Sequence, residues 1–519
     1  MVGKRHITPA LSAAFGAALY YYPAGLFGDG GLGGRAVFTV FFCAALVSFF
    51  RVLGEAPAFF FESPAPDGGD AGGEERERAR AFRFAARLAA AFAVGVFIGA
   101  GARAAVPRGP FPGLPPETVT AVSGTLAEDP GTLQGGRGIG RIDLAYAVNG
   151  SGARAGARGV LPVYFSEENL PRVKEFGRGC AVYVEGTFTA GTEGGRPYFR
   201  AVSVHVTKAA SPLEQMRTGV RQKIVKLAET AGSKEDRWSG LSLALLLGIK
   251  DTLDGDLAAA YRDAGCAHIL ALSGMHLAVL SAAVVFLLKK PLGVRAAAIS
   301  GAIFVTLYVF VVGPQPSLNR AVIMYLLGTA AVLWSLHREP LNLLALSFLV
   351  QIILDPGSGA AVSFVLSYLA LFGILITGDA LRELGRGRIP ELFLGPLSAS
   401  AGAFIAVAPV TAYWFGALRP AGIAAGLLAV PLATVFMALS VPVLFLAGVF
   451  PPAGRAAAPA LSLLYGAQEK IVGLAAAAPG FSPGTAPALA ASLALTAVIL
   501  LLARRAGRNG NRLLPFAGS

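Results

Sequence analysis

Two histidines and a serine gather in one uncharged stretch of the sequence, His268-Ile269-Leu270-Ala271-Leu272-Ser273-Gly274-Met275-His276. Polar groups in a membrane are costly and usually face a cavity or a partner helix. Ser273 and His276 are three residues apart, so a continuous helix would place them on one side, and Gly274 permits a break or a close backbone approach. The stretch is therefore a candidate site.

Three interpretations of these residues can be compared: a nucleophilic site, a helix-packing contact and a metal site. A serine activated by a histidine would act as the nucleophile of an intramembrane protease. Alternatively, the Ser-Gly pair is a helix-packing notch whose histidine is satisfied by a carbonyl group. Metal chemistry is disfavoured, because the five histidines form neither HxH nor HExxH and the three cysteines form no CxxC. We expect no metal, no cofactor and no catalytic residue.

The elements that position this stretch are membrane helices. Charged residues make up 14% of the chain and hydrophobic residues 54%, and the 65 glycines suit closely packed helices. Counting one crossing for each uncharged run gives about twelve helices. The long runs are 6–28, 264–288, 296–319, 356–378, 392–418, 420–454 and 471–503, and shorter ones are 36–50, 88–102, 321–337, 340–354 and 457–478. The last helix should begin near Ala486, after Pro479 and Pro483.

Lysines and arginines predict the orientation, since they concentrate in cytoplasmic loops. They precede the first helix and follow the second and the last, which places both termini in the cytoplasm. The expected segments are about three helices in residues 1–106 with a cytoplasmic linker at 54–87, and a basic cytoplasmic tail at 504–519. The net charge of +13 fits this distribution and does not by itself indicate nucleic acid.

Residues 107–211 have the pattern of an extracytoplasmic β domain. Alternation at Ile142, Leu144, Tyr146 and Val148 and at Cys180, Val182 and Val184 predicts strands, and glycine-rich turns separate them. About five strands in about 100 residues suit a small barrel of the OB-like kind; another small antiparallel sandwich is the alternative.

Residues 212–262 form an amphipathic or interfacial helical segment. Leu213, Met216, Val220, Ile224 and Leu227 recur at helical spacing and could contact either the membrane surface or the β domain. The aspartates that follow, at positions 251, 254, 256 and 263, predict a solvated helix face rather than a cation site.

Several motifs in residues 213–431 resemble the ComEC family of competence proteins. The run from Tyr261 to Gly265 with HILALSGMHLAVL is similar to its "G..HLLAISGLH" signature, and two later blocks also match: one from Arg320 to Pro356 and one from Phe364 to Gly373. Val365 stands where the family usually has Gln, and Gly426 where it usually has Asn. The chain reaches Ser519 without the metallo-β-lactamase-like domain that many members carry, so we expect any nuclease to be a separate protein or to be lacking.

The resemblance implies a polytopic bacterial plasma-membrane protein whose 263–503 channel domain conducts single-stranded DNA during natural transformation. Its implied partners are single-stranded DNA, the lipid bilayer, a DNA receptor, a cytoplasmic helicase-type motor and a homo-oligomeric copy. The expected channel-lining residues are His268, Ser273, Gly274, His276, Asn319, Arg320 and Ser367. A small-solute or envelope-lipid transporter and the intramembrane protease are the alternative functions.

The β domain carries ten basic and nine acidic residues between 111 and 210, so charge alone gives it little affinity for DNA. Stacking on aromatic rings would then contribute on the order of 1–3 kcal/mol per base. Strand alternation places Tyr183 and Phe199 opposite the core-facing residues, and we expect these rings, with Arg141, to contact DNA.

Overall fold

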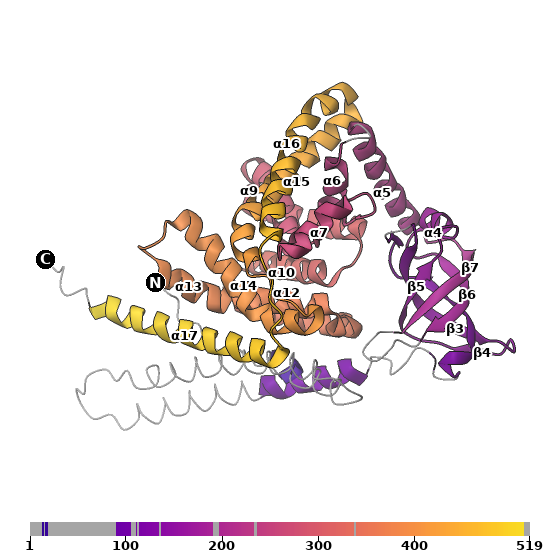
Figure 1. Cartoon of the computed structure of the whole chain (residues 1–519), viewed down its shortest axis with the longest axis horizontal. Coiled ribbons are helices and arrows are strands. Elements are labelled where there is room, and N and C mark those ends of the chain that lie inside the picture. Colours follow the sequence, from indigo (N-terminus) through magenta and orange to yellow (C-terminus); the bar gives the residue numbers. More distant parts are fainter. Residues whose placement is uncertain are drawn as a thin grey trace. The chain divides into compact units, whose positions relative to one another are not determined.

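A computed structural model describes residues 13–14, 16–18, 90–104, 111, 114–133, 136–189, 197–232, 236–336 and 339–512. The helices expected at 6–28 and 36–50 and the linker at 54–87 lie almost wholly outside the described residues. The chain divides into two units. Figure 1 labels the helices and strands of both. The first comprises Met1–Ala105, Ile323–Leu427 and Pro479–Ser519, and the second Val106–Val322 and Leu428–Ala478.

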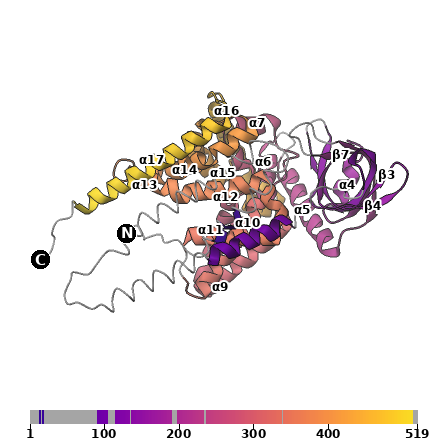
Figure 2. The ribbon, with the colours of Figure 1, turned by 90° about the horizontal axis from the view of Figure 1, so that it is seen from below.

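The second unit begins with a β domain. It comprises η1 (Pro116–Thr118), β1 (Val119–Leu126), β2 (Gly131–Thr132), β3 (Gly138–Asn149), β4 (Arg154–Gly156), β5 (Val160–Phe165), α4 (Leu170–Phe176), β6 (Ala181–Thr189) and β7 (Tyr198–Lys208). The strand order β1-β6-β7-β5-β3 returns to β1, because β3 also pairs with β1. The five long strands therefore close into a ring, visible in Figure 2.

The core of the β domain lies inside this ring. Val122, Ile142, Val163, Cys180 and Val182 are fully buried there, as alternation predicts for one face of each strand. The pairing is antiparallel throughout except between β5 and β7, which run parallel. A parallel pair needs a crossover connection, and the segment containing α4 and β6 supplies it.

The expectation that Phe199 faces away from the core is wrong: its side chain is completely buried. The cause is an irregularity in the pairing of β6 with β7, where Glu185 pairs with Ser203 but Gly186 pairs with Ala201. Val202 is thus the extra residue of a β-bulge. One extra residue exchanges the two faces of a strand, so Phe199 points inward while Val202 is exposed.

Helices make up the rest of the second unit. They are α5 (Pro212–Ala231), α6 (Trp238–Leu247), α7 (Gly255–Asp263), α8 (Ala267–Leu270), α9 (Gly274–Val312), α10 (Pro316–Leu333), α15 (Ala421–Val449) and α16 (Pro451–Ala476), with the unit boundaries falling within α10 and α15. Gly293 divides α9, since its φ of 80° is not helical. The two runs expected at 264–288 and 296–319 correspond to its two segments, although the first helix begins only at Gly274.

The first unit contains the helix Ala90–Ala104 and the helices α11 (Pro340–Leu354), α12 (Val362–Gly373), α13 (Asp379–Gly385), α14 (Glu391–Phe415) and α17 (Thr485–Arg512). A short 3-10 turn, Pro356–Ala360, precedes α12 and a π-helical turn, Ile374–Gly378, follows it. Helices α12 and α14 approach closely because glycines meet: a Cβ on Gly373 would lie 2.4 Å from the carbonyl oxygen of Gly402. The final helix begins one residue before Ala486.

Five described helices are long and apolar enough to cross a membrane: Gly274–Val312, Pro316–Leu333, Val362–Gly385, Glu391–Phe415 and Ala421–Val449. Four shorter apolar helices occur at Ala90–Ala104, Trp238–Leu247, Pro340–Leu354 and Pro487–Leu502. Large apolar side chains such as Phe286, Leu307 and Phe445 are exposed on the long helices, as lipid contact requires. The chain is therefore a membrane protein with a β domain, while the count of about twelve crossings stays a prediction.

The burial of Phe199 predicts that this side chain stabilises the β domain against the opening that exposes Cys180. Replacing Phe199 with Ala should cost about 3–5 kcal/mol and increase the rate at which a thiol reagent labels buried Cys180 by about 100-fold or more. Val202→Ala is the matched control, because Val202 is 69% exposed on the same strand. Equal labelling rates in the two variants would show that Phe199 does not support the core.

Candidate functional site

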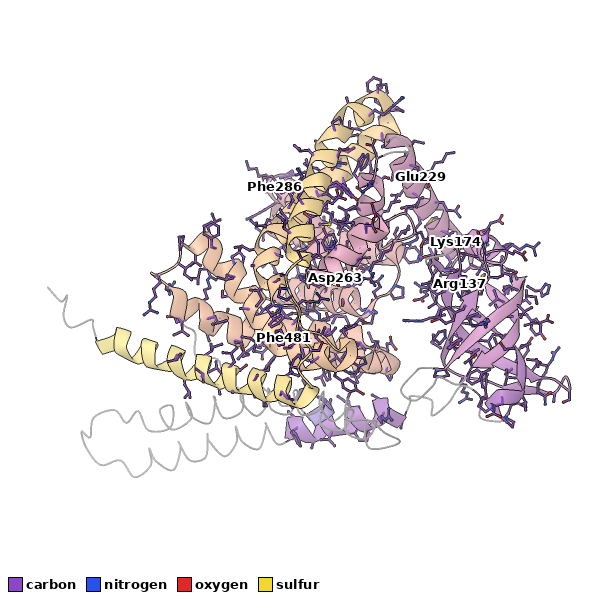
Figure 3. The ribbon with its side chains drawn as sticks, viewed as in Figure 1. Arg137, Lys174, Glu229, Asp263, Phe286 and Phe481 are labelled. Carbon is purple, nitrogen blue, oxygen red and sulfur yellow. The ribbon has the colours of Figure 1, made fainter. Side chains whose placement is uncertain are left out.

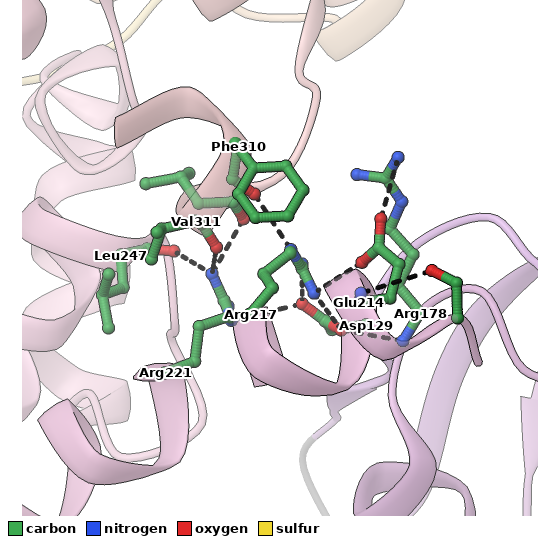
Figure 4. A network of polar contacts seen from close by, with 10 residues as sticks. Asp129, Arg178, Glu214, Arg217, Arg221, Leu247, Phe310 and Val311 are labelled. Atoms are coloured by element: carbon green, nitrogen blue, oxygen red, sulfur yellow. Dashed lines mark hydrogen bonds and ion pairs between the residues drawn. The ribbon is translucent and has the colours of Figure 1, made fainter. Parts of the chain in front are cut away.

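An aspartate of the β domain holds two arginines of α5, and together they contact the end of α9 (Figure 4). Asp129 lies after β1 and accepts from both terminal nitrogens of Arg217, with Nη1 at 3.1 Å from Oδ1. Nε of Arg221 lies 3.2 Å from the same carboxylate, and the main-chain N–H of Arg178 donates to it at 2.9 Å. We call Asp129, Arg217 and Arg221 the Asp129 joint.

The arginines of this joint also satisfy the carbonyl groups at the end of α9. Nε of Arg217 donates to the oxygen of Phe310 at 3.0 Å, and Nη1 of Arg221 donates to Val311 and Val312 at 3.1 and 2.8 Å. The last carbonyls of a helix lack internal partners and carry partial negative charge, so cations stabilise this end. The joint therefore fixes the β domain, α5 and α9 to one another.

Because the Asp129 joint is buried, its stability depends on how the charges of its side chains are paired. The side chain of Arg217 is 1% exposed, so its charge requires a fixed anion. Burial lowers the pKa of the Arg221 guanidinium, and the Asp129 carboxylate opposes this effect. Glu214 adds negative charge 3.5 Å from Nη1 of Arg217.

A second anchor joins the β domain to the segment after α6. The Asp251 carboxylate accepts from the main-chain N–H of Thr132 at 2.8 Å and forms an ion pair with Lys174 of α4, which Figure 3 labels. Nζ of Lys174 also donates to Oγ1 of Thr132 at 2.6 Å. Both anchors hold the connection between β1 and β3, Asp129 near its start and Thr132 within it.

Helix α5 does not use its apolar stripe to pack on the β domain, which was one of the two expectations for it. Arg217 and Arg221 point inward instead, while Leu213, Met216 and Val220 remain exposed. The reason is electrostatic. Asp129 and the carbonyl groups of α9 must be paired, and arginine side chains can satisfy both.

The Ser273–His276 pair begins α9. Ser273 is the residue that caps the helix, and Nδ1 of His276 accepts from the main-chain N–H of Ser273 at 3.2 Å. The serine Oγ lies 2.9 Å from the same nitrogen. This is the spacing of a capping box, with histidine in place of the usual Glu or Gln. The ring is 1% exposed, and its Nδ1 lone pair is shared between the main chain and the hydroxyl.

The structure brings Arg320 close to Gly274, the residue after Ser273. A Cβ on Gly274 would lie 3.3 Å from Cβ of Ala321 and 3.6 Å from Nη2 of Arg320 at the start of α10. Asn319 is half-buried one residue earlier. We call Ser273, Gly274, His276 and Arg320 the α9–α10 cluster.

The other two expected channel residues come from other helices. His268 is on α8, three residues before the extended segment that leads to Ser273, and it interacts electrostatically with His276. Ser367 lies on α12 of the first unit. Within the second unit the structure therefore brings together five of the seven expected residues, His268, Ser273, Gly274, His276 and Arg320, and Asn319 precedes Arg320 in the chain.

The aromatic surface of the β domain differs from the expected one. Tyr183 is half-buried on β6, and Arg141 is exposed with Glu128 3.6 Å away. Tyr164 of β5 and Tyr198 of β7 form an edge-to-face pair with centroids 5.1 Å apart. Arg200 is exposed and pairs with Tyr164 across the strands. Strand alternation missed this group because the pairing of β5 with β7 is not visible in one sequence.

Two aspartates of the segment after α6, Asp251 and Asp254, form contacts within the protein. Besides the Asp251 anchor, the side chain of Asp254 caps α7 and forms an ion pair with Arg237 at 3.0 Å. Among the described residues, no three histidine, cysteine or acidic side chains are grouped to hold a metal ion.

Removing the charge of Asp129 should weaken the fold. Asp129→Asn keeps the size of the side chain but removes the carboxylate that binds both terminal nitrogens of Arg217 and leaves the more distant carboxylate of Glu214, which should cost about 3 kcal/mol. We expect the midpoint temperature for loss of monodisperse, detergent-extracted protein to fall by several degrees. Glu128→Gln is the control, since its exposed ion pair with Arg141 contributes less than about 1 kcal/mol. A Glu128→Gln shift as large as that of Asp129→Asn would contradict this role of the joint.

Comparison with known proteins identifies the family. A family model described as "Competence protein" matches residues 245–508, which is more than half of the chain and includes the α9–α10 cluster. The chain is also similar to "ComE operon protein 3" of Bacillus subtilis (strain 168), with 26% identity over 201 residues. That alignment covers 38% of this chain and 25% of the Bacillus protein. The resemblance seen in the sequence motifs is thereby confirmed, and the chain belongs to the competence protein family, in its ComEC branch.

Proposed function

We propose that this protein is a plasma-membrane channel that brings single-stranded DNA into the cytoplasm during natural transformation. The observation that carries the proposal is the Asp129 joint, which fixes a small β domain to the end of a membrane helix within a chain of the competence family. A DNA strand held by the β domain would then be delivered to a fixed place on the helices.

The topology of the β domain supports an OB-like assignment. Five long strands close as β1-β3-β5-β7-β6, with one parallel pair and a helix between the third and fourth strands. OB folds are five-stranded Greek-key barrels that bind oligonucleotides on the second and third strands and the adjacent loops. The corresponding strands here are β3 and β5.

A DNA strand that extends from β5 onto the neighbouring strand β7 would meet Tyr164 of β5 and Tyr198 and Arg200 of β7. Stacking on the two rings would contribute on the order of 1–3 kcal/mol per base, and Arg200 would contact phosphate. Tyr183 and Arg141 remain candidate contacts, whereas the burial of Phe199 removes it from this set. Near-neutral charge implies weak binding with a shallow dependence on salt.

The α9–α10 cluster is the proposed entrance to the conducting path. Ser273, His276 and Arg320 gather polar groups at the start of a membrane helix, where a hydrated strand could pass. In the proposed orientation the β domain is extracytoplasmic and both termini are cytoplasmic. The DNA receptor, helicase-type motor, separate nuclease and homo-oligomeric copy stay proposed partners.

We further propose that the protein is not an enzyme. One observation favours the protease alternative: Oγ of Ser273 lies 2.9 Å from Nδ1 of His276. The same nitrogen, however, also accepts the main-chain N–H that it caps, whereas a general base needs its lone pair for the hydroxyl proton. Capping of α9 explains both contacts without a reaction.

Deletion of the gene tests the proposed function. In a strain shown to be transformable, the deletion should abolish the appearance of nuclease-resistant DNA inside cells while DNA still binds to the cell surface. A complementing copy should restore entry. Normal internalisation after a clean deletion would contradict the channel proposal.

Two neighbouring substitutions separate a pore from a protease. Ser273→Ala removes one capping group, at a cost of about 1 kcal/mol, and should leave appreciable DNA entry. Gly274→Leu places a side chain against Ala321 and Arg320 and should block entry. Surface binding and the amount of membrane protein should not change in either variant. Loss of function in Ser273→Ala with a tolerated Gly274→Leu would instead indicate a nucleophilic serine.

A further inference from the structure

The first part of the apolar stripe on α5, formed by Leu213, Met216 and Val220, is left uncovered by the rest of the described chain, whereas Ile224 and Leu227 are half-buried. Leu213 and Met216 are 57% and 59% exposed, and Val220, one turn further along the same side, is also exposed. These residues follow one another at three- and four-residue steps, so they form one strip of the helix surface. A strip of this kind in a membrane protein needs an apolar partner.

The Asp129 joint places this part of α5 at the boundary of the bilayer. The second segment of α9, residues 294–312, has 19 residues and is about 28 Å long. The hydrocarbon core of a bilayer is about 30 Å thick, so the ends of this segment coincide with its two boundaries. Arg217 and Arg221 donate to Phe310, Val311 and Val312 at one of those ends.

The charges around the stripe fit a lipid surface. Arg217 and Arg221 lie on an adjacent side of α5 and are engaged by Asp129, so they are not available to lipid. Lys223 and Lys226 are exposed further along the helix. Lysines at such positions can extend their amino groups to lipid phosphates while their stems lie along apolar surface.

We propose that Leu213, Met216 and Val220 contact lipid at the bilayer boundary, so that α5 anchors the β domain to the membrane surface as well as to α9. The occupant of the stripe is the boundary between the headgroups and acyl chains of one leaflet. This proposal does not depend on DNA transport, because it requires only that α9 crosses the membrane.

Spin-label accessibility tests the proposal in the full-length protein. Single labels at Met216→Cys and Val220→Cys report on the stripe, and Gln222→Cys reports on an exposed polar side of the same helix. Burial raises the pKa of Cys180 and of Cys266 to about 11, so both native thiols should resist labelling near neutral pH. Cys43 lies outside the described residues and is replaced by Ser.

The labelled proteins are placed in vesicles of phosphatidylethanolamine and phosphatidylglycerol, and collisions with oxygen and with a water-soluble nickel chelate are compared. Labels at 216 and 220 should favour oxygen by at least about tenfold over the label at 222, because oxygen concentrates in the acyl region and the chelate in water. Chelate access at 216 and 220 equal to that at 222 would overturn the proposal. So would protection of 216 and 220 from both reagents, which would indicate a protein partner, or lipid exposure at all three positions.

Discussion

The buried guanidinium of Arg217 requires negatively charged or carbonyl partners, and separate segments of the second unit supply them. A cation with 1% of its side chain exposed must have fixed negative groups around it. Asp129 of the β domain supplies a carboxylate, and the end of α9 supplies a carbonyl oxygen. Because these partners come from segments far apart in the chain, pairing this one charge places the β domain against the end of α9.

The same contacts specify which loop of the β domain faces the helices. Asp129 and Thr132 both lie in the connection from β1 to β3, and each is bound from the helical part, by Arg217 and Asp251 respectively. In OB folds this connection borders the oligonucleotide-binding face. If DNA binds there, it binds close to where α5 and α9 meet the domain, and stability of the joint and delivery of the strand depend on the same residues.

Sequence patterns predicted the features that local physics controls. Uncharged runs coincide with the five described helices that are long and apolar enough to cross a membrane, and the final helix begins within one residue of its expected start. Alternation found part of the β-domain core, namely Ile142, Leu144, Cys180, Val182 and Val184. The failures have long-range causes. The bulge at Val202 reverses Phe199, and it is visible only in the pairing with β6. Arg217 faces inward because of Asp129, which is 88 residues away. No single-sequence periodicity carries either relation.

The candidate site was predicted only in part, again because local spacing is visible in the sequence and long-range packing is not. Ser273, Gly274 and His276 lie within four residues, so their proximity follows from the sequence, and their Ser-x-x-His spacing is a capping signal that the structure makes explicit. Arg320 joins them through the packing of α10 against the start of α9. The Tyr164–Tyr198 pair depends on the parallel pairing of β5 and β7, which alternation within one strand does not report.

Photo-crosslinking of an incoming strand is the most direct test of a path from the β domain to the helices. A photoreactive side chain is introduced at Tyr164, at Ala321 opposite Gly274, or at Phe286, which is 79% exposed on α9 and serves as the lipid-facing control. During uptake of labelled DNA, crosslinks should form at 164 and 321 and be absent at 286. Crosslinks at none of the three positions in cells that take up DNA normally, or equal crosslinking at 286, would contradict passage of the strand by this path.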